Sequence, residues 1–157
     1  MRARGEEHRI PILQFWNVLL VPLQGDINDT VAAMLAEDVL ERIHRSGAHA
    51  LLLDLTGVWL LDSHLCSVLA RLAASAQLMG TSTIISGMSP DVAHTLQTMG
   101  AELQNVETAL TLESALELAG IRRLQSEADE ELLPTLRSFG FDAFDDALDE
   151  FEPPTRE

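Results

Sequence analysis

Apolar residues recur every three or four positions in four stretches of the chain, and each stretch predicts a helix. In the first, Val31, Leu35, Val39 and Ile43 repeat at every fourth position and form one apolar stripe. Residues that cap helices precede these stretches and glycines follow most of them. The predicted helices run from Asn28 or Asp29 to Gly47, from Asp62 or Ser63 to Gly80, from Ser89 to Gly100, and from about Thr108 to Ala119.

Short apolar runs lie between these helices and predict strands. Residues 50–55, ALLLDL, are almost continuously apolar, which is typical of a strand covered on both faces of a parallel sheet. Alternation of strands with helices predicts helices packed on a mostly parallel, mixed sheet. We therefore predict an α/β fold with about four helices in a single domain over residues 10–121. Its further strands are predicted within residues 10–24, 81–86 and 103–106.

Two polar segments flank the predicted domain. The first, residues 1–9, is short, and the second, residues 122–157, is acidic with a net charge of −7. Phe141, Phe144, Leu148 and Phe151 in the acidic segment have the spacing of one helix face. That face either folds back on the domain or binds a basic partner groove. Because the domain is acidic too, we expect this C-terminal tail to be mobile in the isolated protein.

Charge and composition exclude several classes of function. The 157 residues include 25 acidic and 10 basic residues, a formal net charge of −15, so a nucleic-acid backbone would repel the chain. Every basic residue is arginine, which excludes Schiff-base lysines and P-loop lysines. The one cysteine excludes an internal disulfide and suits a reducing cytoplasm. No apolar stretch is long enough to cross a membrane, so we expect a cytoplasmic protein without membrane contact.

The residue types of an active site do not occur in any catalytic pattern. The chain contains no GxSxG, GxGxxG or Walker sequence, and its five histidines lack the spacing of a helical metal site. Asp54 and Asp62 are a candidate pair of carboxylates, and ordinary capping and turn formation explain both positions. We therefore expect no enzymatic activity, no cofactor and no metal.

Ser63 occupies a position that suits a regulatory modification. It lies where the second predicted helix begins, directly after Asp62. As an N-cap, its hydroxyl oxygen would accept a backbone N–H and stabilise the helix by about 0.5–2 kcal/mol. As a phosphoacceptor, it would place the phosphate where free N–H groups and the helix dipole tolerate negative charge. The added charge of about −1.5 to −2 would change the surface that a partner meets.

The stretch LLLDLTGVWLLDS, followed by an amphipathic helix, resembles the STAS domain of bacterial anti-sigma-factor antagonists. Longer stretches are similar to the RsbS-type branch, the small STAS proteins of the stressosome: IPILQFWNVLLVPLQGDI, LLLDLTGVWLLDSHLCSVLA, LMGTSTIISGMSPDVAHTLQTMG and VETALTLESALELAG. The resemblance covers about residues 10–121. It does not extend to the acidic tail.

The resemblance implies a non-catalytic scaffold that forms homo- and hetero-oligomers with RsbR-type STAS paralogues. It also implies that the assembly holds an RsbT-type serine/threonine kinase and releases it in a stress response when Ser63 is phosphorylated. Thr95 is a secondary candidate acceptor, since RsbR-type proteins use threonines. Asp62, Asp54 and His64 then form the surroundings of the switch.

Two alternatives remain open. The chain is a free anti-sigma-factor antagonist that is switched by the same serine, or it is a small-ligand or nucleotide-binding α/β module. The second alternative draws on the phosphate-binding capacity of sheet ends and helix N-termini, although no glycine-rich loop follows any predicted strand.

Overall fold

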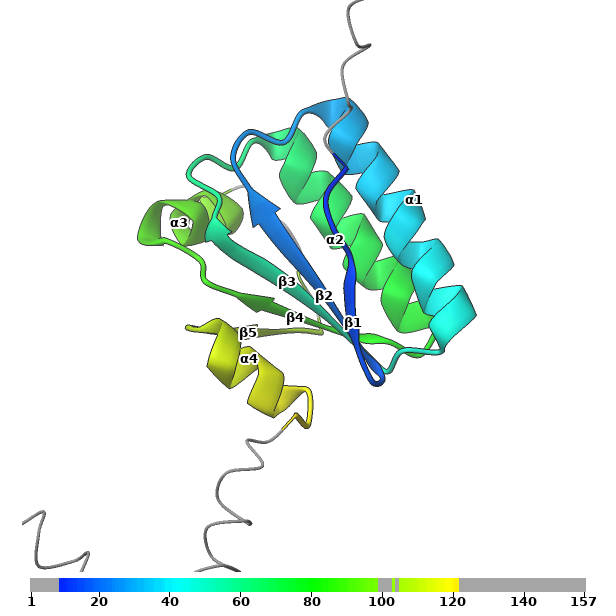
Figure 1. Ribbon diagram of the computed structural model, residues 1–157. Helices are drawn as coiled ribbons and strands as arrows, with labels where there is room; N and C mark the ends of the chain where they lie inside the picture. Colours follow the sequence, from blue (N-terminus) through cyan, green and yellow to red (C-terminus); the bar gives the residue numbers. More distant parts are fainter. Residues whose placement is uncertain (1–8, 99–102, 104, 122–157) are drawn as a thin grey trace, which may run out of the picture. The chain divides into compact units, whose positions relative to one another are not determined.

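The computed structural model describes residues 9–98, 103 and 105–121, which form one five-stranded sheet with four helices (Figure 1). Strands and helices alternate after an initial pair of strands, as the sequence predicts. The strands are β1 (Leu13–Phe15), β2 (Val18–Gln24), β3 (Ala50–Gly57), β4 (Ser82–Ser86) and β5 (Val106–Ala109). The helices are α1 (Asp29–Ser46), α2 (Ser63–Leu78), α3 (Pro90–Thr98) and α4 (Leu112–Leu118).

The sheet is mixed and mostly parallel. Its strand order is β1-β2-β3-β4-β5, and β2 to β5 pair in parallel, while β1 pairs antiparallel with β2 in a hairpin. β3 lies at the centre, where Leu51 is in register with Leu19 of β2 and Thr83 of β4. The predicted α/β fold class with about four helices is therefore confirmed.

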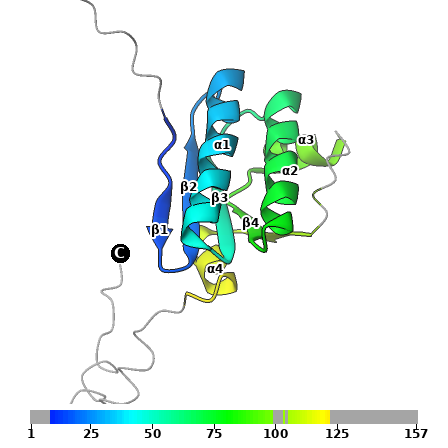
Figure 2. The same ribbon diagram turned by 90° about the vertical axis from the view of Figure 1, so that its right-hand side faces the viewer.

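The two faces of the sheet are covered unequally (Figure 2). Alternate strand residues such as Leu19, Val21, Leu51 and Leu53 form the larger core with α1 and α2. The intervening residues face α4, which contacts β3, β4 and β5. Because each side chain in a strand points to the opposite face from its neighbour, the continuous apolar runs seen in the sequence supply both cores.

Local capping interactions fix where the first helix begins and ends. The Asn28 side chain accepts a hydrogen bond from the backbone N–H of Val31 (2.9 Å), so Asn28 is the N-cap and Asp29 the first helical residue. Gly47 ends the helix with a left-handed backbone (φ 64°), which a residue without a Cβ adopts readily. Both boundaries were predicted from the sequence.

The last strand and the last helix begin later than predicted. The strand expected within residues 103–106 is β5, Val106–Ala109, which pairs with β4 from Thr83 onward. The helix expected from about Thr108 is α4, which Thr111 caps by accepting the backbone N–H of Ser114 (3.2 Å). Thr108 and Thr111 are equivalent candidate caps in the sequence. Because Thr108 pairs with β4 as part of β5, Thr111 caps the helix. The predicted helix end at Gly100, most of segment 1–9 and all of the acidic tail lie outside the described residues.

Candidate functional site: the start of helix α2

The loop between β3 and α2 presents two large apolar side chains to solvent. Val58 and Leu61 are each only 3% exposed and fix the loop to the core, and the Val58 N–H donates to the Leu55 carbonyl (2.9 Å). Trp59 and Leu60, between them, are 84% and 76% exposed. This loop lies at the carboxyl end of a parallel strand, the edge at which open α/β sheets bind their ligands.

Asp62, rather than Ser63, caps helix α2. The Asp62 Oδ1 atom accepts the backbone N–H of Leu65 at 2.7 Å, and the Asp62 carbonyl accepts that of Cys66 at 3.0 Å. The expectation that Ser63 acts as the cap is therefore wrong. Since the backbone turns helical one residue after Asp62, Ser63 is the first residue of α2. Its side chain is exposed, and the Ser63 hydroxyl forms no hydrogen bond with any described residue.

His64 connects the starts of α2 and α1. Its Nε2 atom lies 3.8 Å from Oδ1 of Asp29, and both side chains are exposed to solvent. The pair forms an ion pair only when the imidazole is protonated. An exposed pair of this kind contributes little to stability. Ser63 thus lies between Asp62 and His64 in the chain, and His64 faces the carboxylate of Asp29.

The Asp54 side chain links the carboxyl ends of β3 and β4 through hydrogen bonds. Its Oδ1 atom accepts from the hydroxyl of Thr56 (2.6 Å), the N–H of Thr56 (3.2 Å) and the hydroxyl of Ser86 (3.3 Å). Gly87 follows at φ 72°, and a Cβ there would lie 2.2 Å from the Thr56 hydroxyl oxygen and 2.8 Å from Asp54 Oδ1. The described contacts do not join Asp54 to Ser63, so Asp54 supports the sheet edge from which the loop departs.

Thr95 and Cys66 are less available than Ser63. The Thr95 side chain is partly buried on α3, and its hydroxyl donates to the carbonyl of Asp91 (2.8 Å). Cys66 is buried in the first turns of α2. Burial raises the pKa of the Cys66 thiol above its ordinary value, and the negative charge of Asp62 raises it further. The thiol is therefore protonated and inert at neutral pH.

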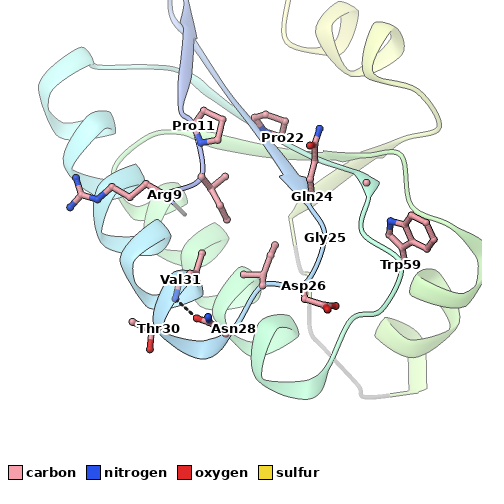
Figure 3. A pocket seen from close by; sticks show the side chains of 13 residues that line it. Arg9, Pro11, Pro22, Gln24, Gly25, Asp26, Asn28, Thr30, Val31 and Trp59 are labelled. Carbon is pink, nitrogen blue, oxygen red and sulfur yellow. Dashed lines mark hydrogen bonds between the residues drawn. The ribbon is translucent and has the colours of Figure 1, made fainter. Parts of the chain in front are cut away.

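An open cleft of about 980 Å³ lies beside the loop (Figure 3). Trp59 and Arg9 approach it from opposite sides, while residues between the end of β2 and the start of α1 form its floor. The lining is mixed: Arg9, Ile10, Pro11, Pro22, Gln24, Gly25, Asp26, Ile27, Asn28, Thr30, Val31, Gly57 and Trp59. The exposed Trp59 and Leu60 and this cleft were not predicted, because an apolar run such as VWLL does not reveal which of its members face solvent.

Two kinds of feature are absent from the part of the chain that the structure describes. That part holds no group of three or more His, Cys, Asp or Glu side chains placed to bind a metal ion. Within residues 9–98 and 105–121, no helix combines the length and the apolar character that crossing a bilayer requires.

Comparison with known families identifies this arrangement. The family model described as the STAS domain matches residues 9–115, a span that contains the sheet, the capped start of α2 and Ser63. The chain belongs to the STAS domain family. The resemblance seen in LLLDLTGVWLLDS is thereby confirmed, with the serine at the strand–loop–helix junction.

The relatives include proteins of bacterial stress signalling. The RsbT co-antagonist protein RsbRD of Bacillus subtilis is 33% identical over 103 residues, which are 66% of this chain and 37% of that protein. The co-antagonist RsbRC of the same organism is 31% identical over 105 residues, 67% of this chain and 37% of its own length. The chain thus spans little more than a third of the length of these curated relatives.

A solved structure of RsbS from Moorella thermoacetica, carrying a serine-to-glutamate substitution, is also similar. It superposes with a TM-score of 0.66 at 27% identity over 71% of this chain and 95% of the RsbS chain. The anti-sigma-factor antagonist SpoIIAA, at 14% identity and a TM-score of 0.60, shares the fold. This STAS domain is therefore related to the RsbR and RsbS proteins of the stressosome and has the fold of the anti-sigma-factor antagonists.

Proposed function

We propose that this chain is a non-catalytic stressosome scaffold of the RsbS type, which holds an RsbT-type serine/threonine kinase and releases it when Ser63 is phosphorylated. In this function Ser63 is the acceptor, Asp62 and His64 are its immediate surroundings, and Asp54 supports the sheet edge behind the loop. The domain spans residues 10–121 between a short N-terminal segment, residues 1–9, and the acidic tail, residues 122–157. RsbR-type paralogues are its partners in a hetero-oligomer.

The observation that carries the proposal is the free, exposed hydroxyl of Ser63 on the first residue of α2. Asp62 already satisfies the N–H of Leu65, so a modified Ser63 costs the helix no cap. The N–H groups of Ser63 and His64 belong to the first turn of α2, where a helix leaves its donors without intrahelical partners. These donors and the positive end of the helix dipole favour a phosphate at this position.

In this proposal, phosphorylation of Ser63 changes the charge at the start of α2 without changing the fold. The phosphate adds about −1.5 to −2 charges at a residue that directly follows Asp62 in the chain. A kinase surface that fits the neutral hydroxyl of Ser63 then meets a concentrated negative charge, which favours its release.

One feature supports the RsbS type over the RsbR type. The matching residue, Ser63, is a serine, whereas the resemblance assigns threonine acceptors to RsbR-type proteins. Thr95 remains a secondary acceptor in this proposal, although its partly buried hydroxyl and its bond to Asp91 make it a poorer substrate.

Phosphosite mapping tests the proposal. The chain is incubated with an RsbT-type kinase and ATP and then digested for peptide mass spectrometry. Phosphate on Ser63 is expected, with loss of the signal in Ser63→Ala and no change in Ser67→Ala, which removes another exposed serine from the same helix. Phosphate mainly on Ser67 or Thr95 contradicts the proposal. A tight complex with the kinase that forms equally well without an RsbR-type paralogue favours the free anti-sigma-factor antagonist instead.

The cleft beside Trp59 favours one further candidate, a small-ligand or nucleotide-binding module. Its volume of about 980 Å³ would admit a nucleotide, and Arg9 supplies a cation at its edge. Isothermal titration calorimetry with GTP and ATP tests this function directly. Binding that Arg9→Ala weakens supports the ligand module, and no heat of binding leaves the scaffold function as the account of this site.

A further inference from the structure

A hollow lined by arginines lies between α1 and the segment that leads into β1. Its volume is about 360 Å³, and Arg9 of that segment and Arg42 and Arg45 of α1 line it. In Figure 3 the Arg9 side chain extends from this segment toward α1. Residues 9–98, 103 and 105–121 contain only one further arginine, Arg71 on α2. Because the whole chain has a net charge of −15, this gathering of cations gives the hollow a local preference for anions that the rest of the chain lacks.

Carboxylates in the hollow neutralise only part of this positive charge. Asp38 and Glu41 line it together with the arginines, and Glu41 forms an ion pair with Arg45 at the i, i+4 spacing. The Asp38 Oδ2 atom lies 3.9 Å from Nε of Arg9, although Asp38 has the same i, i+4 spacing to Arg42. The exposed Arg42 guanidinium forms no ion pair or hydrogen bond with any described residue. Three arginines against two acids leave a net charge of +1, and the N–H donors of Arg42 are free to bind an anion.

The floor of the hollow is apolar. Ile10 and Ile12 line it, and both are partly buried and pack against the larger core. A small inorganic anion makes no use of such a floor, whereas a peptide has apolar side chains to place on it. Arginine beside apolar surface is characteristic of protein–protein interfaces, in which arginine is enriched. The lining therefore fits a peptide that carries both carboxylates and apolar side chains.

We propose that this hollow binds an acidic segment of a partner protein. Carboxylates of the segment pair with the guanidinium groups of Arg42, Arg9 and Arg45, whose planar forks match the two oxygens of a carboxylate. An apolar side chain of the same segment packs on Ile10 and Ile12. Asp38 and Glu41 compete with the incoming carboxylates for the arginines, so the segment binds weakly and reversibly.

The hollow is separate from the start of α2. His64, next to Ser63, lies 3.8 Å from Asp29 in the first turn of α1. Arg42 lies about 20 Å further along the axis of α1 than Asp29, at the rise of about 1.5 Å per residue of an α-helix. An acidic segment in the hollow and a kinase at Ser63 can therefore bind at the same time, and the proposal does not rest on phosphorylation of Ser63.

Fluorescence anisotropy with the full, unmodified chain and a short labelled peptide of glutamate and leucine tests the proposal. The titrations are made at physiological ionic strength, where charges further away than about 8 Å are largely screened. Arg42→Glu is expected to raise the dissociation constant at least about tenfold. Arg71→Glu is the matched control, because it makes the same change in net charge on another helix, and it should change the dissociation constant by less than about twofold.

Neutralising a competing carboxylate should have the opposite effect on binding. Asp38→Asn removes the carboxylate beside Arg9 and is expected to lower the dissociation constant by about threefold. Glu37→Gln removes the same charge from the neighbouring α1 residue, which does not line the hollow, and should leave the dissociation constant nearly unchanged. An equal gain of affinity in Asp38→Asn and Glu37→Gln contradicts the proposal, because it reports only the lower net charge of the chain.

Far-ultraviolet circular dichroism verifies the fold of each variant. A wild-type chain that does not bind the peptide overturns the proposal, and so do equal losses of affinity in Arg42→Glu and Arg71→Glu. A peptide of glutamate and serine that binds as tightly as the peptide of glutamate and leucine overturns the role of the apolar floor. Inorganic pyrophosphate that displaces the peptide and binds more tightly overturns a protein segment as the occupant and identifies a site for small anions.

Discussion

The capping of α2 by Asp62 gives a quantitative test of the structure around Ser63. Asp62 Oδ1 accepts the Leu65 N–H at 2.7 Å, whereas the Ser63 hydroxyl has no hydrogen-bonding partner among the described residues. Asp62→Ala removes the cap and is expected to lower the free energy of unfolding by about 0.5–2 kcal/mol. Ser63→Ala removes an exposed hydroxyl from the first helical position, where alanine is a good helix former, and is expected to change it by less than about 0.5 kcal/mol.

Urea unfolding followed by circular dichroism measures both effects. With a slope of about 2 kcal/mol per M for a small domain, a loss of about 1 kcal/mol in Asp62→Ala lowers the midpoint by about 0.5 M. Asp62→Asn is the matched control, because asparagine keeps an oxygen that accepts the Leu65 N–H and removes the charge. Its midpoint should stay close to that of the wild type.

Two results would refute this reasoning. If Ser63→Ala lowers the midpoint as much as Asp62→Ala does, Ser63 contributes to the cap and its hydroxyl is not free. If Asp62→Asn is as unstable as Asp62→Ala, the charge of Asp62 on the helix dipole matters rather than the hydrogen bond. Either outcome would weaken the argument that a phosphate on Ser63 leaves α2 intact.

Three further predictions concern stability. Gly87→Ala should lower the free energy of unfolding by at least about 2 kcal/mol, because its Cβ would lie 2.2 Å from the Thr56 hydroxyl oxygen. Gly80→Ala is the control: it has a φ of 85° but open space around the new Cβ, so it should lower the free energy by only about 1 kcal/mol. Equal losses of stability in thermal denaturation would contradict the predicted clash at Gly87. Because burial raises the pKa of the Cys66 thiol, stability should be fully present below the ordinary value of 9.0 and fall as the pH rises above it. Urea unfolding should show that the free energy of unfolding falls less between pH 7 and pH 10 in Cys66→Ala than in the wild type. An equal fall in both proteins would exclude the Cys66 thiol as a cause of the pH dependence. Trp16→Gly should unfold at an equal or higher temperature than Trp16→Ala, because glycine adopts a φ of 50° without strain. A lower midpoint for Trp16→Gly than for Trp16→Ala in calorimetry would contradict backbone strain at this position.

Periodicity predicted most of the fold because burial dictates it. The stripe from Val31 to Ile43 has the period of a helix, and Ala50–Leu55 has the continuous apolar character of a strand covered on both faces. Asn28 and Gly47 mark the ends of α1 because their roles depend on local backbone geometry alone. The sequence therefore contained the architecture in its local patterns.

The remaining features depend on contacts that no local pattern encodes. Thr108 and Thr111 are equivalent caps in the sequence, and pairing of Val106–Ala109 with β4 excludes the first. In the same way Asp62 and Ser63 are adjacent candidate caps, and the departure of the loop from β3 selects Asp62. The exposure of Trp59 between the buried Val58 and Leu61 likewise follows from the path of the loop over the core.

In the proposed function, phosphorylation of Ser63 releases a kinase from a scaffold that stays folded. The most direct measurement is the amount of RsbT-type kinase that co-elutes from size-exclusion chromatography with the chain and an RsbR-type paralogue. Wild type and Ser63→Ala should retain the kinase in a large complex. Ser63→Asp, whose carboxylate is favourable at the start of α2, should lose it while keeping its thermal midpoint and the paralogue. Equal retention of the kinase by Ser63→Ala and Ser63→Asp would contradict the account.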